Sequence, residues 1–260
     1  MRRKFISVLY GLLAFLAAEG VQIAVASILG ILYVLIHGLN LGIEMDSNTL
    51  YLMSIGAAVV CGVAFAVWYY GALIEGTREE KKARFHHFTT RHNILWFLIL
   101  GVGCQFFTSG IMAFIQSYFP KTFEQYSEVL ELLTSGRLEL VILFAIVIAP
   151  IVEEMIFRGV ILHLIGRGNT QLITILMQAI LFGIYHGNIV QGIYGAVLGA
   201  LLGYIMVSYH TIAAPILLHM IINASSFLVN LFPNNHYSLL LMTLIGVAFL
   251  TGGIKQIKPV

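Results

Sequence analysis

Long apolar runs separated by short polar connections make up most of this chain. A transmembrane helix needs about 17 to 25 predominantly apolar residues, and eight runs are near or above that length. They cover residues 5–37, 50–74, 93–118, 138–165, 170–186, 191–208, 212–232 and 237–254. The pattern therefore predicts an all-α fold, a polytopic transmembrane helical bundle of about eight spans, with residues 1–260 forming a single membrane-embedded domain.

The connections and interruptions divide this bundle into parts. Residues 1–118 hold three N-terminal spans and a basic loop at 76–92, residues 138–232 hold the core spans, and residues 233–260 hold the last span and the C-terminus. Between them, residues 119–137 have apolar positions at spacings of three and four with glutamates on other faces, which predicts an amphipathic helix at the membrane interface. Glu19 interrupts the first run, and we expect it to end a helix or to pack into the bundle.

Two features of the core spans predict local geometry. Pro150 lies inside the fourth run and should kink that helix, because its ring displaces a backbone hydrogen bond. Gly195, Gly199 and Gly203 recur at a spacing of four in the sixth run. Small residues on one face let helix backbones approach closely, so this face is expected to pack against a neighbouring helix.

Composition and charge narrow the class of protein. Hydrophobic residues make up 59% of the chain and charged residues only 10%, against about 25% charged in soluble domains. The net charge of +2 gives no reason to expect a nucleic-acid partner, so the expected surroundings are a lipid bilayer. Basic residues gather at the N-terminus, in the 76–92 loop and near the C-terminus, which predicts that both termini are cytoplasmic. Cys61 and Cys104 both lie inside predicted spans and indicate neither a disulfide framework nor a metal site.

Three ionisable residues stand out because they lie within the apolar run at 138–165. They are Glu153, Glu154 and Arg158. A charge at membrane depth is costly, at least about 2.5 to 3.5 kcal/mol, and is a functional-site hypothesis by default. Glu154 and Arg158 are four apart and can pair along one helix face, whereas Glu153 lies about 100° round the helix from Glu154. The alternative is a buried salt bridge with Glu153 lining a polar cavity.

Two later spans add polar groups that suggest a shared intramembrane site. His186 ends the fifth run, and the seventh run holds His219 with Asn223 one turn later. A carboxylate, two imidazoles and a carboxamide in a low-dielectric bundle suit amide hydrolysis: Glu153 with His186 could activate a water, and His219 with Asn223 could stabilise the oxyanion. Ser225 and Ser226 have no nucleophile motif around them, and the sequence lacks His-Glu-x-x-His and a Walker loop.

These motifs, taken in order, resemble the CPBP family of intramembrane proteases. The resemblance rests on Glu-Glu-x-x-x-Arg at 153–158, Phe-x-x-x-His as Phe182 and His186, and His-x-x-x-Asn as His219 and Asn223. That family contains the eukaryotic CAAX-processing endopeptidases of the Rce type and the bacterial Abi and bacteriocin-processing proteins. The resemblance implies a membrane endopeptidase whose catalytic residues are Glu153, His186, His219 and Asn223, with Glu154, Arg158 and Phe182 supporting the site.

The resemblance leaves cofactor and substrate open. Glu153, His186 and His219 could hold a zinc with an open fourth position. A metal-free glutamate mechanism uses the same groups and explains Asn223 better, so no cofactor is favoured. The expected substrate is a membrane-associated peptide or protein, and the compact loops favour a bacterial plasma-membrane protein. The alternative is a non-proteolytic scaffold or bacteriocin self-immunity protein that keeps the pocket for binding.

Overall fold

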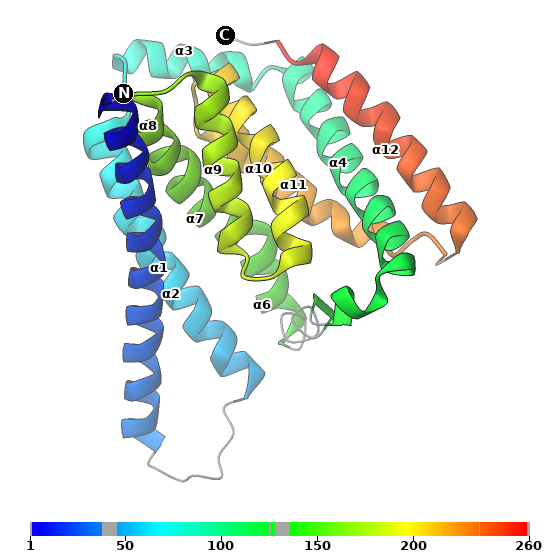
Figure 1. Ribbon diagram of the computed structural model, residues 1–260, viewed down its shortest axis with the longest axis horizontal. Helices are drawn as coiled ribbons and strands as arrows, with labels where there is room; N and C mark the ends of the chain where they lie inside the picture. Colours follow the sequence, from blue (N-terminus) through cyan, green and yellow to red (C-terminus); the bar gives the residue numbers. More distant parts are fainter. Residues whose placement is uncertain (1, 38–45, 125, 128–135, 234, 259–260) are drawn as a thin grey trace. The chain divides into compact units, whose positions relative to one another are not determined.

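The computed structural model describes residues 2–37, 46–124, 126–127, 136–233 and 235–258, and within them it contains helices but no strand (Figure 1). Eight apolar helical segments match the predicted runs. They are α1 (Arg2–His37), α2 (Ser47–Trp68) continued by the π-helical Tyr69–Leu73, α4 (Arg91–Tyr118), the helical segments of Leu138–Gly166, α9 (Gln171–Tyr185), α10 (Ile189–Tyr209), α11 (Ala213–Val229) and α12 (His236–Gln256). Six are long and apolar enough to cross a membrane, and α9 and α11 are shorter, with 15 and 17 residues. The prediction of an all-α multi-pass membrane protein is thereby confirmed.

The first run is one continuous helix. α1 has 36 residues and passes through Glu19 without a break. At 1.5 Å per residue it is about 54 Å long, well beyond the roughly 30 Å hydrocarbon thickness of a bilayer. Glu19 is half-buried in the middle of α1, so the expectation that it ends a helix is wrong and the expectation that it packs into the bundle agrees better with the structure.

The run that holds the glutamates stays helical around its proline. It consists of α6 (Leu138–Ile142), a π-helical segment (Leu143–Ile148), α7 (Ala149–Glu154), a second π-helical segment (Met155–Ile161) and α8 (Leu162–Gly166). Pro150 lies inside this continuous helical run, since the residue before α7, Ile148, has helical backbone angles (φ −71°, ψ −53°). π-helical turns often occur at functional sites, and the second of these segments contains Arg158. The expected kink at Pro150 stays a prediction.

The chain divides into two compact units, residues 1–74 with 128–170 and residues 75–127 with 171–260, which are described separately. In the first unit α1 packs on α2 and on the 138–166 segment. Small residues allow these contacts, since a Cβ at Gly62 would meet the Val152 side chain at 2.7 Å. Phe15 of α1 and Phe157 have ring centroids 6.4 Å apart. The expected single domain of residues 1–260 stays a prediction.

In the second unit α4 packs along α12 and against α11, and α9 lies beside α10 (Figure 1). A buried cluster around Phe97, Tyr209 and Leu218 joins α4, α10 and α11. The loop expected at 76–92 contains a further helix, α3 (Arg78–Phe88). Its start is a capping box in which the Thr77 hydroxyl accepts from Glu80 N–H and the Glu80 carboxylate accepts from Thr77 N–H. Thr-x-x-Glu was the sequence signal for this helix.

The predicted interfacial helix at 119–137 falls partly outside the described residues. Residues 120–124, 126 and 127 are helical, with Phe123 buried and Glu124 exposed as the amphipathic pattern requires. Residues 128–135, which hold the rest of that pattern, and residues 38–45, which form most of the predicted first loop, lie outside the described residues. The interfacial position of the helix stays a prediction.

Candidate active site

A fully buried ion pair lies in the first unit. Arg158 Nη1 donates to Glu154 Oε1 over 2.8 Å, and both side chains have 0% relative exposure. The pair is i, i+4 on one helix face, as the sequence predicted. Ile156, Phe157 and Val160 of the same helical segment also have 0% exposure, so the pair lies in a buried apolar part of the first unit. A pair shielded in this way contributes to stability only while both partners are charged, because either one alone would be a buried, uncompensated charge.

Glu153 is more exposed than the two residues of this pair. It is half-buried, whereas its neighbour Glu154 is fully buried. Of the two carboxylates, Glu153 is therefore the one that remains accessible for chemistry, and Glu154 is the one held by Arg158.

In the second unit, a backbone hydrogen bond fixes the orientation of His186. Its Nδ1 lies 2.8 Å from the carbonyl oxygen of Phe182, one turn earlier in α9. A carbonyl oxygen only accepts, so Nδ1 carries the proton and donates. Nε2 of the neutral ring is then the acceptor, which is the arrangement that a general base needs.

The Phe182 ring lies between the two candidate catalytic histidines. Its centroid is 4.9 Å from that of His186 and 5.9 Å from that of His219, edge to face with both. Phe182 and His219 are buried, with 2% and 7% exposure. Asn223 follows His219 by one turn on α11 and is half-buried. Within the second unit, the Phe182 ring therefore contacts His186 of its own helix and His219 of α11, and the catalytic site that these residues would form stays a prediction.

The glycine face of α10 holds α9 at close range. A Cβ at Gly199 would lie 3.1 Å from Phe182 Cδ1 and 3.2 Å from Ala179 Cα, and a Cβ at Gly195 would lie 3.4 Å from His186 Nδ1. The predicted packing face is confirmed, and its partner is the helix that carries Phe182 and His186. A side chain at Gly199 would press on Phe182, whereas a methyl group at Gly195 would be in ordinary contact with the His186 ring.

Sequence reasoning missed one polar residue at this contact. Gln178 is fully buried, and its Nε2 donates to the backbone carbonyls of Gly199 across the contact (2.8 Å) and of Ile175 (2.9 Å). Gln178, Phe182 and His186 share one helix face at a spacing of four, which is the signal that could have identified it. Gln178 thus ties α9 to α10 two turns before His186.

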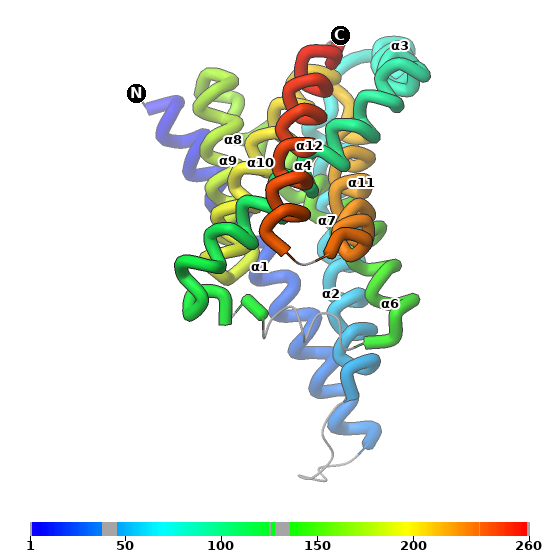
Figure 2. The backbone as a smooth tube through the Cα atoms, turned by 90° about the vertical axis from the view of Figure 1, so that its right-hand side faces the viewer, coloured from blue at the N-terminus to red at the C-terminus, as the bar shows by residue number. Residues whose placement is uncertain are grey.

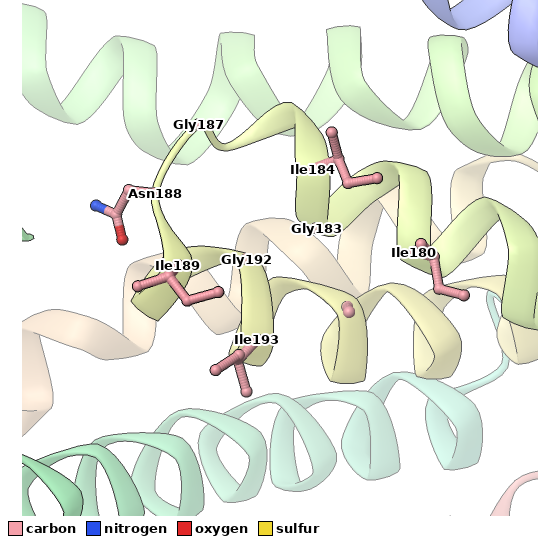
Figure 3. Close-up of a pocket in the computed structure, with 9 residues that line it drawn as sticks. Ile180, Gly183, Ile184, Gly187, Asn188, Ile189, Gly192 and Ile193 are labelled. Atoms are coloured by element: carbon pink, nitrogen blue, oxygen red, sulfur yellow. The ribbon is translucent and has the colours of Figure 1, made fainter. Parts of the chain in front are cut away.

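An apolar groove opens beside the turn that joins α9 and α10. It has a volume of about 520 Å³ and is lined by residues of both helices and the turn (Figure 3): Ile180, Gly183, Ile184, Gly187, Asn188, Ile189, Gly192, Ile193 and Ala196. Ile180 and Ile184 lie on the opposite side of α9 from Phe182 and His186, since each isoleucine precedes one of these residues by two positions and two residues turn a helix by about 200°. The groove is therefore separate from the two imidazoles.

No metal site was found in the part of the chain that the structure describes, where no group of three or more His, Cys, Asp or Glu side chains could hold an ion. The conceivable zinc ligands Glu153, His186 and His219 come from both units, as does the whole candidate site. Their assembly into one site stays a prediction.

A comparison with known families bears on these residues directly. Residues 136–225 match the family model "Type II CAAX prenyl endopeptidase Rce1-like". No curated protein and no solved structure matches the chain. The matched segment covers about a third of the chain and includes the four candidate catalytic residues and the three supporting ones. The match confirms the resemblance to the CPBP family of CAAX proteases over this segment of the chain.

Proposed function

We propose that this protein is an intramembrane endopeptidase that hydrolyses a peptide bond of a membrane-associated peptide or protein. The observation that carries the proposal is the family match over residues 136–225, which contains every residue that the chemistry requires. Two contacts support it. Glu154 is paired with Arg158, which leaves Glu153 as the carboxylate proposed for catalysis, and the His186 ring is oriented by the Phe182 carbonyl so that Nε2 can act as a base.

In the proposed reaction Glu153 and His186 act on one water molecule. Glu153, the accessible carboxylate, and Nε2 of His186, the free acceptor of the ring, orient the water and take its proton. The hydroxide adds to the carbonyl carbon of the scissile peptide, and the carbonyl π electrons move to the oxygen. Collapse of this tetrahedral intermediate breaks the C–N bond, and the leaving amine takes the proton that the water gave up.

His219 and Asn223 are proposed to stabilise the oxyanion. They are one helical turn apart on α11, so an imidazole N–H and an amide N–H can point at the same oxygen. Losing one such donor typically costs about 10²- to 10³-fold in rate. Phe182 is proposed to contribute indirectly, because its ring packs against both the His186 and the His219 ring.

A direct test uses purified protein in vesicles with a membrane-anchored reporter peptide, with products identified by mass spectrometry. Prenylated and unprenylated versions of the reporter establish whether the substrate carries a lipid. Cleavage should disappear in Glu153→Gln and His186→Ala, and fall by about 10²-fold in Asn223→Ala. Full cleavage by Glu153→Gln would contradict the proposal.

The same preparations test the preference for a metal-free reaction. Wild-type protein that cleaves the reporter should contain far less than one zinc per chain and should keep its activity in a chelator. Stoichiometric zinc that is lost together with activity in His186→Ala would instead assign Glu153, His186 and His219 as ligands.

A further inference from the structure

The second unit has a strongly basic end that the proposed chemistry does not use. It combines residues 75–92, from the start of α3 to the start of α4, with residues 255–258 at the end of α12. These two segments hold seven basic and three acidic residues, a net charge of +4, whereas the whole chain carries only +2. In both views the end of α12 lies at the same end of this unit as α3 (Figures 1 and 2).

One face of α3 combines positive charge with an aromatic ring. Arg78, Lys82 and Phe85 follow one another at spacings of four and three, so they share a face, and all three are exposed. Phe85 is 51% exposed, although the opposite side of the helix buries Phe88 in the core. An exposed aromatic ring on the same face as two cations is typical of a helix at a membrane surface.

The C-terminal residues are held against this helix by specific contacts. Nε2 of His87 lies 2.8 Å from the carbonyl oxygen of Lys258, and Nε2 of His92 lies 3.1 Å from that of Gln256. Both ring nitrogens donate, because carbonyl oxygens only accept. Ile257 between them is buried in the same cluster as Phe88. The exposed Lys255 and Lys258 are therefore fixed beside α3 although more than 160 residues of sequence separate them from it.

One of the acidic side chains at this end is already hydrogen-bonded within the protein. The Glu80 carboxylate accepts the Thr77 N–H in the capping box. Arg84 donates to the backbone carbonyl of Glu75 and not to a carboxylate. In the part of the chain that the structure describes, no salt bridge neutralises the basic residues of this end.

We propose that this end of the second unit binds the headgroups of anionic phospholipids in the leaflet that it faces. Lysines and arginines clustered beside a membrane-spanning helix attract such lipids, each near the surface adding favourable energy. Lipid fits better than a soluble acidic partner, because Phe85 supplies an apolar anchor and because α4 and α12, which adjoin the cluster, are apolar spans. The binding is independent of peptide hydrolysis.

Tryptophan quenching tests this proposal without any activity assay. The chain has two tryptophans, and Trp68→Phe leaves only Trp96, which lies against Gly252 of α12, one turn before Gln256. The protein is placed in vesicles of equimolar phosphatidylglycerol and phosphatidylcholine, with bromine on one lipid or the other. Brominated phosphatidylglycerol should quench Trp96 roughly twofold more than brominated phosphatidylcholine at low salt, because the basic cluster enriches it nearby.

Two double variants, each of which removes two positive charges, test whether the lipid enrichment depends on this basic end or only on the protein's total charge. Lys82→Gln with Lys258→Gln, both exposed, should reduce the excess quenching, and so should raising the salt to about 0.5 M. Arg2→Gln with Arg3→Gln removes the same charge from the first unit and should leave the excess quenching unchanged. Equal quenching by the two brominated lipids in the Trp68→Phe protein, or equal effects of the two double variants, would overturn the proposal.

Discussion

The buried ion pair makes the sharpest stability prediction, which concerns Glu154→Gln. This change leaves the Arg158 guanidinium fully buried without its 2.8 Å carboxylate partner. Breaking a buried pair typically costs about 3 to 5 kcal/mol. We therefore expect a loss of at least the lower limit of this range, about 3 kcal/mol. For a chain of this size that corresponds to a decrease of roughly 6 to 12 °C in melting temperature.

The two native cysteines supply the assay. Cys61 in the first unit and Cys104 in the second are free and have 0% and 2% exposure, so a thiol-reactive dye reports their exposure on heating. In a Cys104→Ser background the Cys61 signal should move to lower temperature in Glu154→Gln and stay within about 1 °C of the parent in Glu153→Gln.

A double variant checks the physical reason. Glu154→Leu with Arg158→Met removes both charges and keeps apolar volume, and such replacements are often neutral or stabilising. We therefore expect it to recover most of the loss seen in Glu154→Gln. Equal destabilisation by Glu153→Gln and Glu154→Gln, or a double variant less stable than Glu154→Gln, would refute the division of roles between the two glutamates.

Three other predictions concern packing, pH and orientation. Gly199→Leu should destabilise the second unit by about 1 to 3 kcal/mol and reduce activity, because it displaces Phe182; dye labelling of Cys104 in a Cys61→Ser background reports this unit. Gly20→Leu, with no atom within 4 Å of its Cβ, should change neither activity nor the temperature at which Cys61 is labelled. Hydrogen bonds from Thr49 hold the pKa of the Asp46 carboxyl at the start of α2 below its ordinary value. The ionised Asp46 carboxylate therefore stabilises the protein fully above about pH 4, and this stabilisation is lost as the pH falls through the lowered pKa of Asp46. The melting temperatures of wild type and Asp46→Asn should converge in acid, and a difference that stays constant with pH would contradict this. Reporters fused after Val260 and inserted near Lys82 should be cytoplasmic and one near Asn48 external, and an external C-terminus would contradict an even number of spans.

The sequence predicted the spans well because apolar length is what a bilayer demands. Each of the eight runs became an apolar helix close to its predicted ends, and i, i+4 spacing was enough to predict the Glu154–Arg158 pair. The charge pattern at 76–92 concealed α3, since composition indicated a loop while the Thr77 capping box determined a helix.

Contacts across helices were harder to predict. Small residues at spacing four predicted a packing face on α10, but not that Gln178 would cross it to bond Gly199. Periodicity places residues on a face without specifying the neighbour, so the position of Phe182 between the two histidines depended on tertiary packing. The His186 tautomer likewise depends on a rotamer that allows Nδ1 to reach its own helix backbone.

The central claim is that Glu153 and His186 belong to one site, and proximity cross-linking tests it most directly. Replacing Cys61 and Cys104, the only two cysteines, by serine allows Glu153→Cys to be paired with His186→Cys in membranes. A thiol cross-linker about one peptide unit long should join that pair efficiently. It should fail with Ile184→Cys, which lies on the opposite, exposed side of α9. Efficient cross-linking of 153 to 184 but not to 186 would contradict a shared site and the hydrolytic mechanism built on it.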